Sequence, residues 1–231
     1  MINGKRVIAV IPARAGSKSV IDKNIKLLAG KPLVAWPIDV AKKSKYIDRI
    51  IVSTDGEKII SVAKEYNAEV YLRPEILAQD KSLLIDALRD LIRRLKSENE
   101  EAEYLVVLEP TCPLRSVEDV DNVIEKLITH NSSATFIEAD LNPNRAWKIN
   151  SKGVEPFIEG AIPWLPRQEL PEAYQLNGAV YGLRINELLS DSISILFGDI
   201  AAIKMPIERS IDIDNELHFL IAEEIIKAYK L

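Results

Sequence analysis

The fold is decided by a short apolar run and the loop behind it, VIAVI at residues 7–11 followed by PARAGSKS at residues 12–19. Five apolar residues in succession are typical of a strand that is buried on both faces. Ligands of open parallel sheets gather at the carboxyl ends of strands, so this loop of small residues is a candidate phosphate site. Arg14, Lys18 and Lys23 would add positive charge. An ordinary strand-to-helix connection is the alternative, because neither the P-loop nor the dinucleotide spacing is present.

The same pattern continues outward from this stretch. Further apolar runs at 50–52, 70–72 and 105–108 alternate with helical patterns at 57–66 and 83–96. Ser116 and Asp119 have capping-box spacing, which predicts a helix that ends near His130. Strands at 178–183 and 200–205 and a helix at 215–229 complete the series. We therefore expect an open three-layer αβα sandwich around a mainly parallel, Rossmann-like sheet.

One segment interrupts this alternation. Prolines at 143, 156, 163, 166 and 171 break it, and residues 150–153 resemble a turn between extended runs at 147–149 and 154–158. We expect a single domain over 1–231 with an inserted arm at 141–175.

Composition excludes several classes of function. The 231 residues include 30 basic and 35 acidic side chains, giving a net charge of -5, so nucleic acid is not an expected partner. No apolar run approaches the roughly 20 residues that span a bilayer, and no signal-peptide pattern is present. We therefore expect a cytoplasmic protein that does not associate with membranes. A single cysteine excludes a disulfide framework, and two distant histidines make a histidine triad or metal cage difficult to build.

Two carboxylates two positions apart, Asp212 and Asp214, precede the last predicted helix. In an extended backbone they point to the same side and could bind one hard cation. The alternative is that Asp214 caps the helix.

Six segments in order resemble the acylneuraminate cytidylyltransferases, also called CMP-sialic acid synthetases. They are IAVIPARAGSK (8–18), KNI (23–25), GKPL (30–33), LEPTCPLR (108–115), NGA (177–179) and SIDIDNE (210–216). The resemblance implies a fold of the nucleotide-diphospho-sugar transferase type. It also implies Mg²⁺-dependent transfer of CMP from CTP to a nine-carbon keto-sugar acid, with release of pyrophosphate, in a homodimer formed through the arm.

The resemblance also implies roles for residues at matched positions. Triphosphate and cytidine would be held by Arg14, Ala15, Gly16, Ser17, Lys23, Asn24 and Arg73. The sugar would lie over residues 109–115, and its candidate contacts are Glu109, Thr111, Cys112, Arg145, Arg167 and Asn177. The two arm arginines are candidates for its carboxylate, and one of them can act across the dimer. Catalysis would rest on Lys23, Asp212 and Asp214, with the two aspartates as metal ligands and Asp212 as candidate proton acceptor.

The chain departs from the family pattern at several of these positions. Ala15 and Ser19 stand where glycines are usual, and alanine adopts positive φ less freely. Asp22 replaces a basic or glycine residue near the phosphates. Glu109 replaces a glutamine and Cys112 a serine; because a carboxylate only accepts hydrogen bonds, we hypothesise that the sugar presents a donor to Glu109. The competing interpretation places Glu109 in an internal polar network.

Three other functions compete with this one. A synthetase for an eight-carbon keto-sugar acid usually carries a different motif after the fourth strand. A glycosyltransferase would place its Asp-x-Asp in mid-chain. A nucleotide-binding homologue without activity is opposed by the presence of Lys23, Asp212 and Asp214. The resemblance implies a bacterial or archaeal protein that serves capsule, lipopolysaccharide or glycoprotein glycans.

Overall fold

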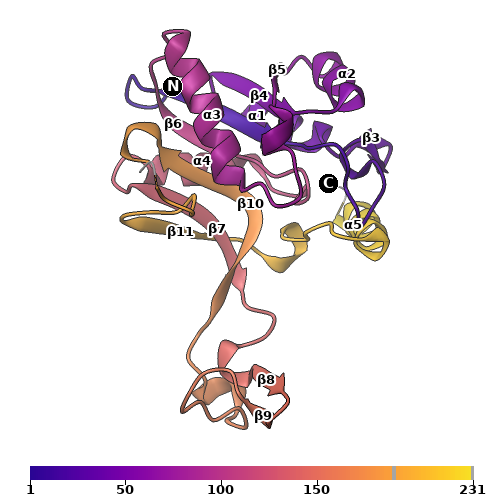
Figure 1. Ribbon diagram of the computed structural model, residues 1–231, viewed down its shortest axis with the longest axis vertical. Helices are drawn as coiled ribbons and strands as arrows, with labels where there is room; N and C mark the ends of the chain where they lie inside the picture. The colour runs from indigo at the N-terminus through magenta and orange to yellow at the C-terminus, as the bar shows by residue number, and fades with distance from the viewer. Residues whose placement is uncertain (189–190, 230–231) are drawn as a thin grey trace.

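The computed structural model describes residues 1–188 and 191–229. Its main sheet has the strand order β11-β7-β10-β6-β1-β4-β5 (Figure 1). These strands are β1 (Arg6–Pro12), β4 (Arg49–Thr54), β5 (Glu69–Leu72), β6 (Ala102–Val107), β7 (Ser132–Glu138), β10 (Tyr174–Arg184) and β11 (Ile200–Lys204). β10 is antiparallel to β6 and β7, and the other pairs of this sheet are parallel. The expected mainly parallel sheet is confirmed.

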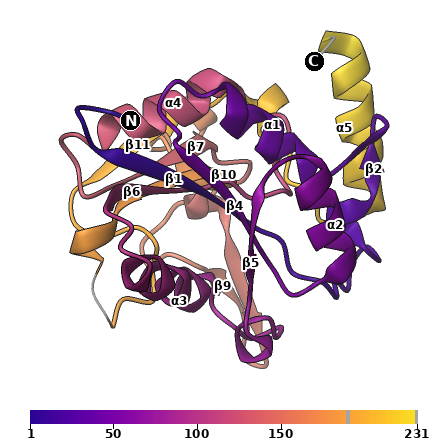
Figure 2. The same ribbon diagram turned by 90° about the horizontal axis from the view of Figure 1, so that it is seen from above.

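Helices cover both faces of the sheet, as Figure 2 shows. They are α1 (Ala35–Lys43), α2 (Glu57–Glu65), α3 (Leu84–Ser97), α4 (Val117–Lys126) and α5 (Glu216–Tyr229). Val7, Ala9 and Ile11 of β1 pack with α1, α2 and α4, whereas Ile8 and Val10 pack with α3. This alternation produces two apolar cores from one strand, because successive side chains point to opposite faces. α5 forms a third cluster with Val20 of the loop after β1, with Leu28 of the short strand β2 (Leu27–Leu28) and with Leu33, which follows the short strand β3 (Lys31–Pro32).

Most predicted elements are confirmed, with small shifts at their ends. Ser116 caps α4 in the predicted capping box, although α4 ends at Lys126, before His130. Pro37 lies in the first turn of α1, where a proline is tolerated. The sequence pattern does not predict β7, because its buried positions include Ser132, Ser133 and Thr135 instead of an apolar run. Their hydroxyl groups donate to Phe197 O, Val123 O and Asn177 Oδ1, so the polar atoms cost little when buried.

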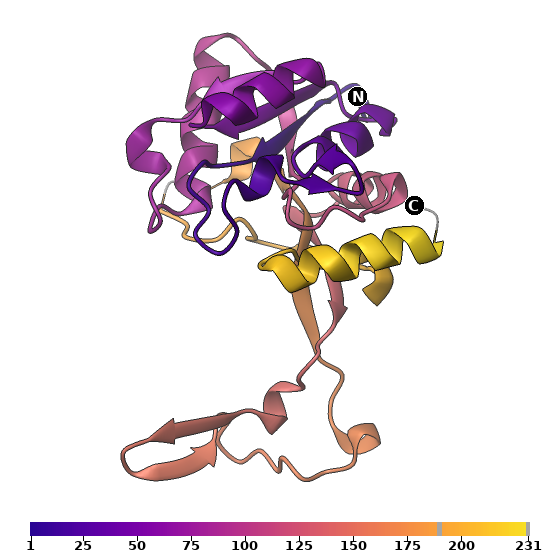
Figure 3. The same cartoon turned by 90° about the vertical axis from the view of Figure 1, so that its right-hand side faces the viewer.

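The segment between β7 and β10 projects from the body as an arm (Figure 3). It contains a hairpin of β8 (Trp147–Asn150) and β9 (Gly153–Pro156), preceded by a 3₁₀ turn at Pro143–Arg145 and followed by another at Arg167–Glu169. The hairpin and its turn lie where the sequence predicts them, although β9 ends at Pro156 and not at residue 158. Within the described ranges, no helix has the length and apolar character that crossing a membrane requires.

The carboxyl ends of β1, β4, β5 and β6 meet at one edge of the sheet. They lead into residues 13–22, into Asp55 and Gly56, into Arg73 and into residues 108–115. β7 runs parallel to these strands, so the arm leaves the body from the same edge. In this class of sheet, that edge is where ligands bind.

Candidate active site

The loop after β1 is fastened to the body from two sides. Asp55 Oδ1 accepts a hydrogen bond from Ala15 N at 2.7 Å, and Asn24 Nδ2 donates to Arg14 O at 2.9 Å. Gly16 has φ +70°, a conformation that an L side chain rarely adopts. The loop is therefore preset in shape. The N–H of Ala15 already has a partner, so the expected contribution of this backbone group to phosphate binding is unsupported by the geometry.

A pocket of about 340 Å³ lies between this loop and the start of α2. Its lining residues are Arg14, Ala15, Gly16, Ser17, Asp22, Lys23, Asn24, Ile25, Gly56, Glu57, Lys58 and Ile59. Six of the residues that the resemblance assigns to the nucleotide thus share one cavity. Asn24 is buried and its amide holds the loop carbonyl, which makes it a support of the pocket wall.

Arg73 enters this region from the end of β5. It is 7% exposed, and its guanidinium donates from Nε to Ser53 Oγ and from Nη2 to Ser53 O. Burial lowers its pKa, while the nearby Asp55 carboxylate opposes that effect. Arg73 is therefore fixed against β4 and lies within electrostatic range of Arg14 and Asp55.

The cations of the loop have carboxylate partners within the chain. Asp80 accepts from Arg14 Nη1 at 2.7 Å and also contacts Lys18 Nζ, and these two contacts lower its pKa. Lys23 Nζ donates to Ile213 O at 2.8 Å and lies 3.5 Å from Asp214 Oδ1. Lys23 thus joins this pocket to the carboxylate pair.

The carboxylate pair lies on the segment that enters α5. Ile213 N donates to Thr111 O at 2.7 Å, and the Thr111 side chain hydrogen-bonds Asp212. Ile213 is fully buried, whereas the aspartates on either side of it reach solvent, as expected for an extended backbone with both carboxylates on one side. The Asp212 side chain reaches solvent, yet partial burial of its carboxylate raises its pKa, and the nearby Asp214 carboxylate makes a smaller contribution in the same direction.

The capping alternative for Asp214 is wrong. Asn215 Oδ1 accepts from His218 N at 3.0 Å at the start of α5, so the cap is Asn215. The backbone N–H of Asp214 donates to His218 Nδ1. The Asp214 carboxylate is consequently not used in capping and faces Lys23.

Glu109 lies at the end of β6 beside this pair. Burial raises the pKa of Glu109 to about 7; the Asp212 and Asp214 carboxylates add to the shift, and Arg115 and Lys23 oppose it. The carboxylate of Glu109 lies close to Gly178 of β10, since a Cβ placed on Gly178 would be 3.7 Å from Glu109 Oε2. Gly178 lies in the stretch of β10, between Leu176 and Tyr181, where the pairing register with β7 shifts. Glu109 thus shares the electrostatic environment of Asp212.

This shift predicts a pH-dependent stability. The folded state favours the protonated form of Glu109. The resulting contribution to the free energy of unfolding is fully present below the ordinary pKa of 4.5 and is lost as the pH rises through about 7. Without divalent metal, we expect Glu109→Gln to match the wild type at pH 5 and to exceed its unfolding free energy by about 2 kcal/mol at pH 8. Urea unfolding at both pH values measures this, with Glu101→Gln as an exposed control. Equal effects at the two pH values would contradict the assigned burial.

Two residues assigned to the sugar are largely enclosed by protein. Cys112 is fully buried, and burial raises the pKa of its thiol to about 12, so it is a packed and unreactive side chain. Asn177 is 5% exposed. Its Oδ1 accepts from Thr135 and Ala179, and its Nδ2 donates to Ser210, so its amide ties β7, β10 and the segment before α5 together. Both residues support the site from behind.

The arm arginines are not brought to Glu109 within one chain. Arg145 and Arg167 line a separate pocket of about 420 Å³ at the base of the arm, which includes neither Glu109 nor Asn177. Arg145 Nη2 donates to Leu165 O at 2.9 Å, and Arg167 pairs with Glu138 at 2.5 Å. A single chain therefore leaves the expected sugar region without these two cations.

Sequence reasoning missed Asp55, Asp80 and Lys58. Asp55 follows β4 in Ser53-Thr54-Asp55-Gly56, at the same sheet edge as the first loop, and this position was the available signal. Asp80 lies in a loop between β5 and α3 that has no recognisable pattern. Only the folded chain brings these residues against the basic loop.

Comparisons with known proteins identify the family of this chain. The sequence profile of the Cytidylyltransferase family matches residues 8–225. A CMP-N,N'-diacetyllegionaminic acid synthase of Legionella pneumophila is 33% identical over 226 residues, covering 96% of this chain and 97% of the relative. An N-acylneuraminate cytidylyltransferase of Streptococcus agalactiae is 31% identical over 217 residues, covering 92% of this chain and 51% of the relative. A pseudaminic acid cytidylyltransferase of Campylobacter jejuni is 32% identical over 75% of this chain and 76% of its own length.

Solved structures share the fold at low sequence identity. A CMP:2-keto-3-deoxy-manno-octonic acid synthetase complexed with CTP has a TM-score of 0.71 and 14% identity, and covers 98% of this chain and 100% of its own. A 4-diphosphocytidyl-2C-methyl-D-erythritol synthase from Anaerococcus prevotii has a TM-score of 0.66 and 16% identity, and covers 97% of this chain and 100% of its own.

Proposed function

The chain belongs to the cytidylyltransferase family and is a nucleotidyltransferase, and from this premise we propose that it joins CMP from CTP to a sialic-acid-like nonulosonic acid. The products are the CMP-sugar and pyrophosphate. The observation that carries the proposal is the junction made by Lys23, which lines the basic pocket beside α2 and contacts Ile213 O and Asp214 in the segment that carries Asp212 and Asp214. The names of the relatives support the sugar class.

The protein residues bind and orient the two reactants. Arg14, Ser17 and Lys23 would hold the triphosphate, and Arg73 would help seat the nucleotide. The sugar hydroxyl oxygen forms a bond to the α-phosphorus while the bond from that phosphorus to the β-phosphate oxygen breaks and pyrophosphate leaves. Asp212 accepts the hydroxyl proton, directly or through water. Lys23 stabilises charge on the departing pyrophosphate.

The donor set fits Mg²⁺. Among the residues that the structure describes, no cluster of three or more His, Cys, Asp or Glu side chains could hold a metal by itself. Mg²⁺ commonly takes one or two carboxylates and completes its shell with water and substrate phosphates, which Asp212 and Asp214 would satisfy. Burial, with a smaller contribution from Asp214, raises the pKa of Asp212, and a bound cation would favour its charged form. When bound, Mg²⁺ would polarise the phosphate and lower the pKa of the attacking hydroxyl.

Pyrophosphate release tests the reaction. With Mg²⁺, we expect release only when CTP and one nonulosonic acid are both present, and not with the other three nucleoside triphosphates. An eight-carbon keto-sugar acid belongs in the same panel. Turnover of that acid alone would replace the proposed substrate, and CTP binding without turnover across the panel would favour an inactive homologue.

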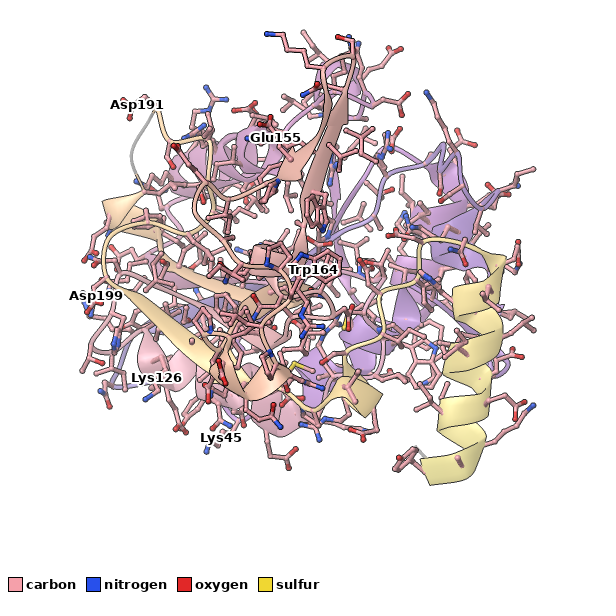
Figure 4. All side chains as sticks on the ribbon, turned by 90° about the horizontal axis from the view of Figure 1, so that it is seen from below. Lys45, Lys126, Glu155, Trp164, Asp191 and Asp199 are labelled. Carbon is pink, nitrogen blue, oxygen red and sulfur yellow. The ribbon has the colours of Figure 1, made fainter. Side chains whose placement is uncertain are left out.

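The arm supports a homodimer. Its surface exposes many large apolar side chains, of which Trp164 and Ile149 are each 82% exposed. Figure 4 looks onto this arm and labels Trp164 and Glu155. The rings of Trp147 and Trp164 lie 6.0 Å apart between centroids, which adds to an apolar surface that monomers rarely expose. A symmetric partner would cover it and would bring a second pair of arm arginines, Arg145 and Arg167, to the assembly.

We expect the double variant Trp164→Ser, Ile149→Ser to be monomeric and to lose most turnover, because the arm would lose the apolar surface that binds the partner subunit. Light scattering after size exclusion measures the mass. Ile193→Ser, at a position in the body that is also 82% exposed, is the matched control and should stay dimeric. A double variant that remains dimeric would contradict the assignment of the interface.

A further inference from the structure

Lys58 is a cation in the basic pocket that neither the sequence resemblance nor the site geometry above uses. It occupies the second position of α2, on the pocket wall opposite residues 22–24. Its Nζ lies 2.7 Å from Asp22 Oδ2. Asp22 comes from the loop side of the pocket and has φ +53°. The Lys58–Asp22 ion pair thus joins the two sides of the pocket.

The position of Lys58 is unfavourable for the helix alone. A positive side chain in the first turn is repelled by the helix dipole, whose N-terminal end is itself positive. No side chain caps α2, and its N-cap residue is Gly56. A Cβ on Gly56 would lie 3.0 Å from Ala15 Cβ, so the loop and the helix approach closely only because this residue is glycine. Both the lysine and the close approach suit an anion held between loop and helix.

The Lys58–Asp22 pair is also easily exchanged. The two side chains are 72% and 49% exposed, and exposed ion pairs hold their members weakly. The other cations of this region are paired with carboxylates in the same way. Asp80 pairs with Arg14 and Lys18, and Asp214 lies beside Lys23. A triphosphate carries several negative charges and can replace one carboxylate oxygen with phosphate oxygens.

We propose that Lys58 is a further triphosphate-binding residue and that Asp22 is its internal counter-ion in the nucleotide-free chain. Nucleotide binding exchanges the Lys58–Asp22 pair for a contact between Lys58 and phosphate. The proposal rests on the proposed function, since it assigns this residue within the CTP site. It also gives a physical role to Asp22, which the sequence presents only as a lost positive charge.

A double-mutant cycle tests the exchange. Calorimetric dissociation constants for CTP are measured for the wild type, Lys58→Met, Asp22→Asn and the double variant. Lys58→Met should weaken CTP about tenfold and raise the inhibition constant of inorganic pyrophosphate by a similar factor, with the KM for the sugar acid unchanged. Asp22→Asn should tighten CTP about threefold when Lys58 is present and have no effect when it is absent. Lys58→Arg should retain most of the affinity.

The controls separate this role from a structural one. Lys64→Met changes an exposed lysine at the other end of the same helix and should leave CTP binding unchanged. A merely structural ion pair would make Asp22→Asn and Lys58→Met weaken CTP alike, with parallel losses of melting temperature. The proposal is overturned if Lys58→Met stays within twofold of the wild type, or if Asp22→Asn does not tighten binding in the Lys58 background. If the wild type binds no CTP at all, the proposed function fails, and pyrophosphate binding still reports on Lys58.

Discussion

Asp212→Asn is expected to lower kcat by about three orders of magnitude, the scale seen when a group that stabilises transition-state charge is removed. Asparagine keeps the shape of the side chain and can still accept the Thr111 hydrogen bond. It cannot take up the hydroxyl proton in the proposed reaction, and it removes one of the two carboxylates proposed to hold Mg²⁺. The loss should therefore fall on turnover and on the Mg²⁺ dependence. The dissociation constant for CTP measured without metal should change little.

The stability of the same variant should move in the opposite direction. The surrounding protein raises the pKa of Asp212, so the charged form is disfavoured in the metal-free fold at neutral pH. Asp212→Asn should consequently melt at or above the wild-type temperature in a chelator, which excludes unfolding as the cause of lost activity. Asp199→Asn, at an aspartate that is 72% exposed beside His130, is the control for removing a charge. Turnover within tenfold of the wild type would remove Asp212 from the reaction.

Lys23→Met is expected to lower kcat/KM for CTP by about two to three orders of magnitude. The Lys23 side chain is only 11% exposed, and its Nζ is held by Ile213 O at 2.8 Å beside Asp214. Its charge is thus held between the basic pocket and the carboxylates before substrates arrive, and preorganised charge of this kind would stabilise the leaving pyrophosphate of the proposed reaction. Methionine keeps the length of the stem and removes the ammonium.

Lys26→Met is the matched control for this change. Lys26 is three residues further along the chain, pairs with Glu216 and lies 4.8 Å from the centroid of the Phe219 ring. Its loss should affect the packing of α5 and leave kcat/KM for CTP within threefold. Initial rates at varied CTP with saturating sugar acid give the comparison. Equal losses in the two variants would indicate that Lys23 acts through the local fold and not through its charge.

The sequence predicts the scaffold well, because the scaffold depends on local patterns. Runs such as Val7–Ile11 are too apolar to face water, and the alternation with amphipathic helices leaves few arrangements other than a covered parallel sheet. The Ser116 capping box likewise acts through neighbours in the chain. β7 is not predicted by the sequence, because its buried serines and threonine find hydrogen-bond partners on other elements, and no local pattern indicates such partners.

Candidate residues could be chosen by resemblance, but their roles depend on what surrounds them. Asn24 and Asn177 carry the expected residue type at the expected position, and the fold uses their amides to hold neighbouring segments. Lys58 and Asp80 carry no sequence signal, yet one enters the basic pocket and the other covers its cations. Such roles follow from distances between segments that are remote in sequence.

The sequence by itself determined the family and the layered architecture, since these rest on ordered motifs and on periodicity, and it marked Lys23, Asp212 and Asp214 as candidate catalytic residues. Only the tertiary structure decided that Asn215 and not Asp214 caps α5, that Cys112 is enclosed, and that the arm arginines lie apart from Glu109 in one chain. The physical reason is that hydrogen bonding and burial are short-range in space. The hydrogen bonds and the burial of a residue depend on which remote segments come together at the carboxyl edge of the sheet, and its neighbours along the chain do not determine this.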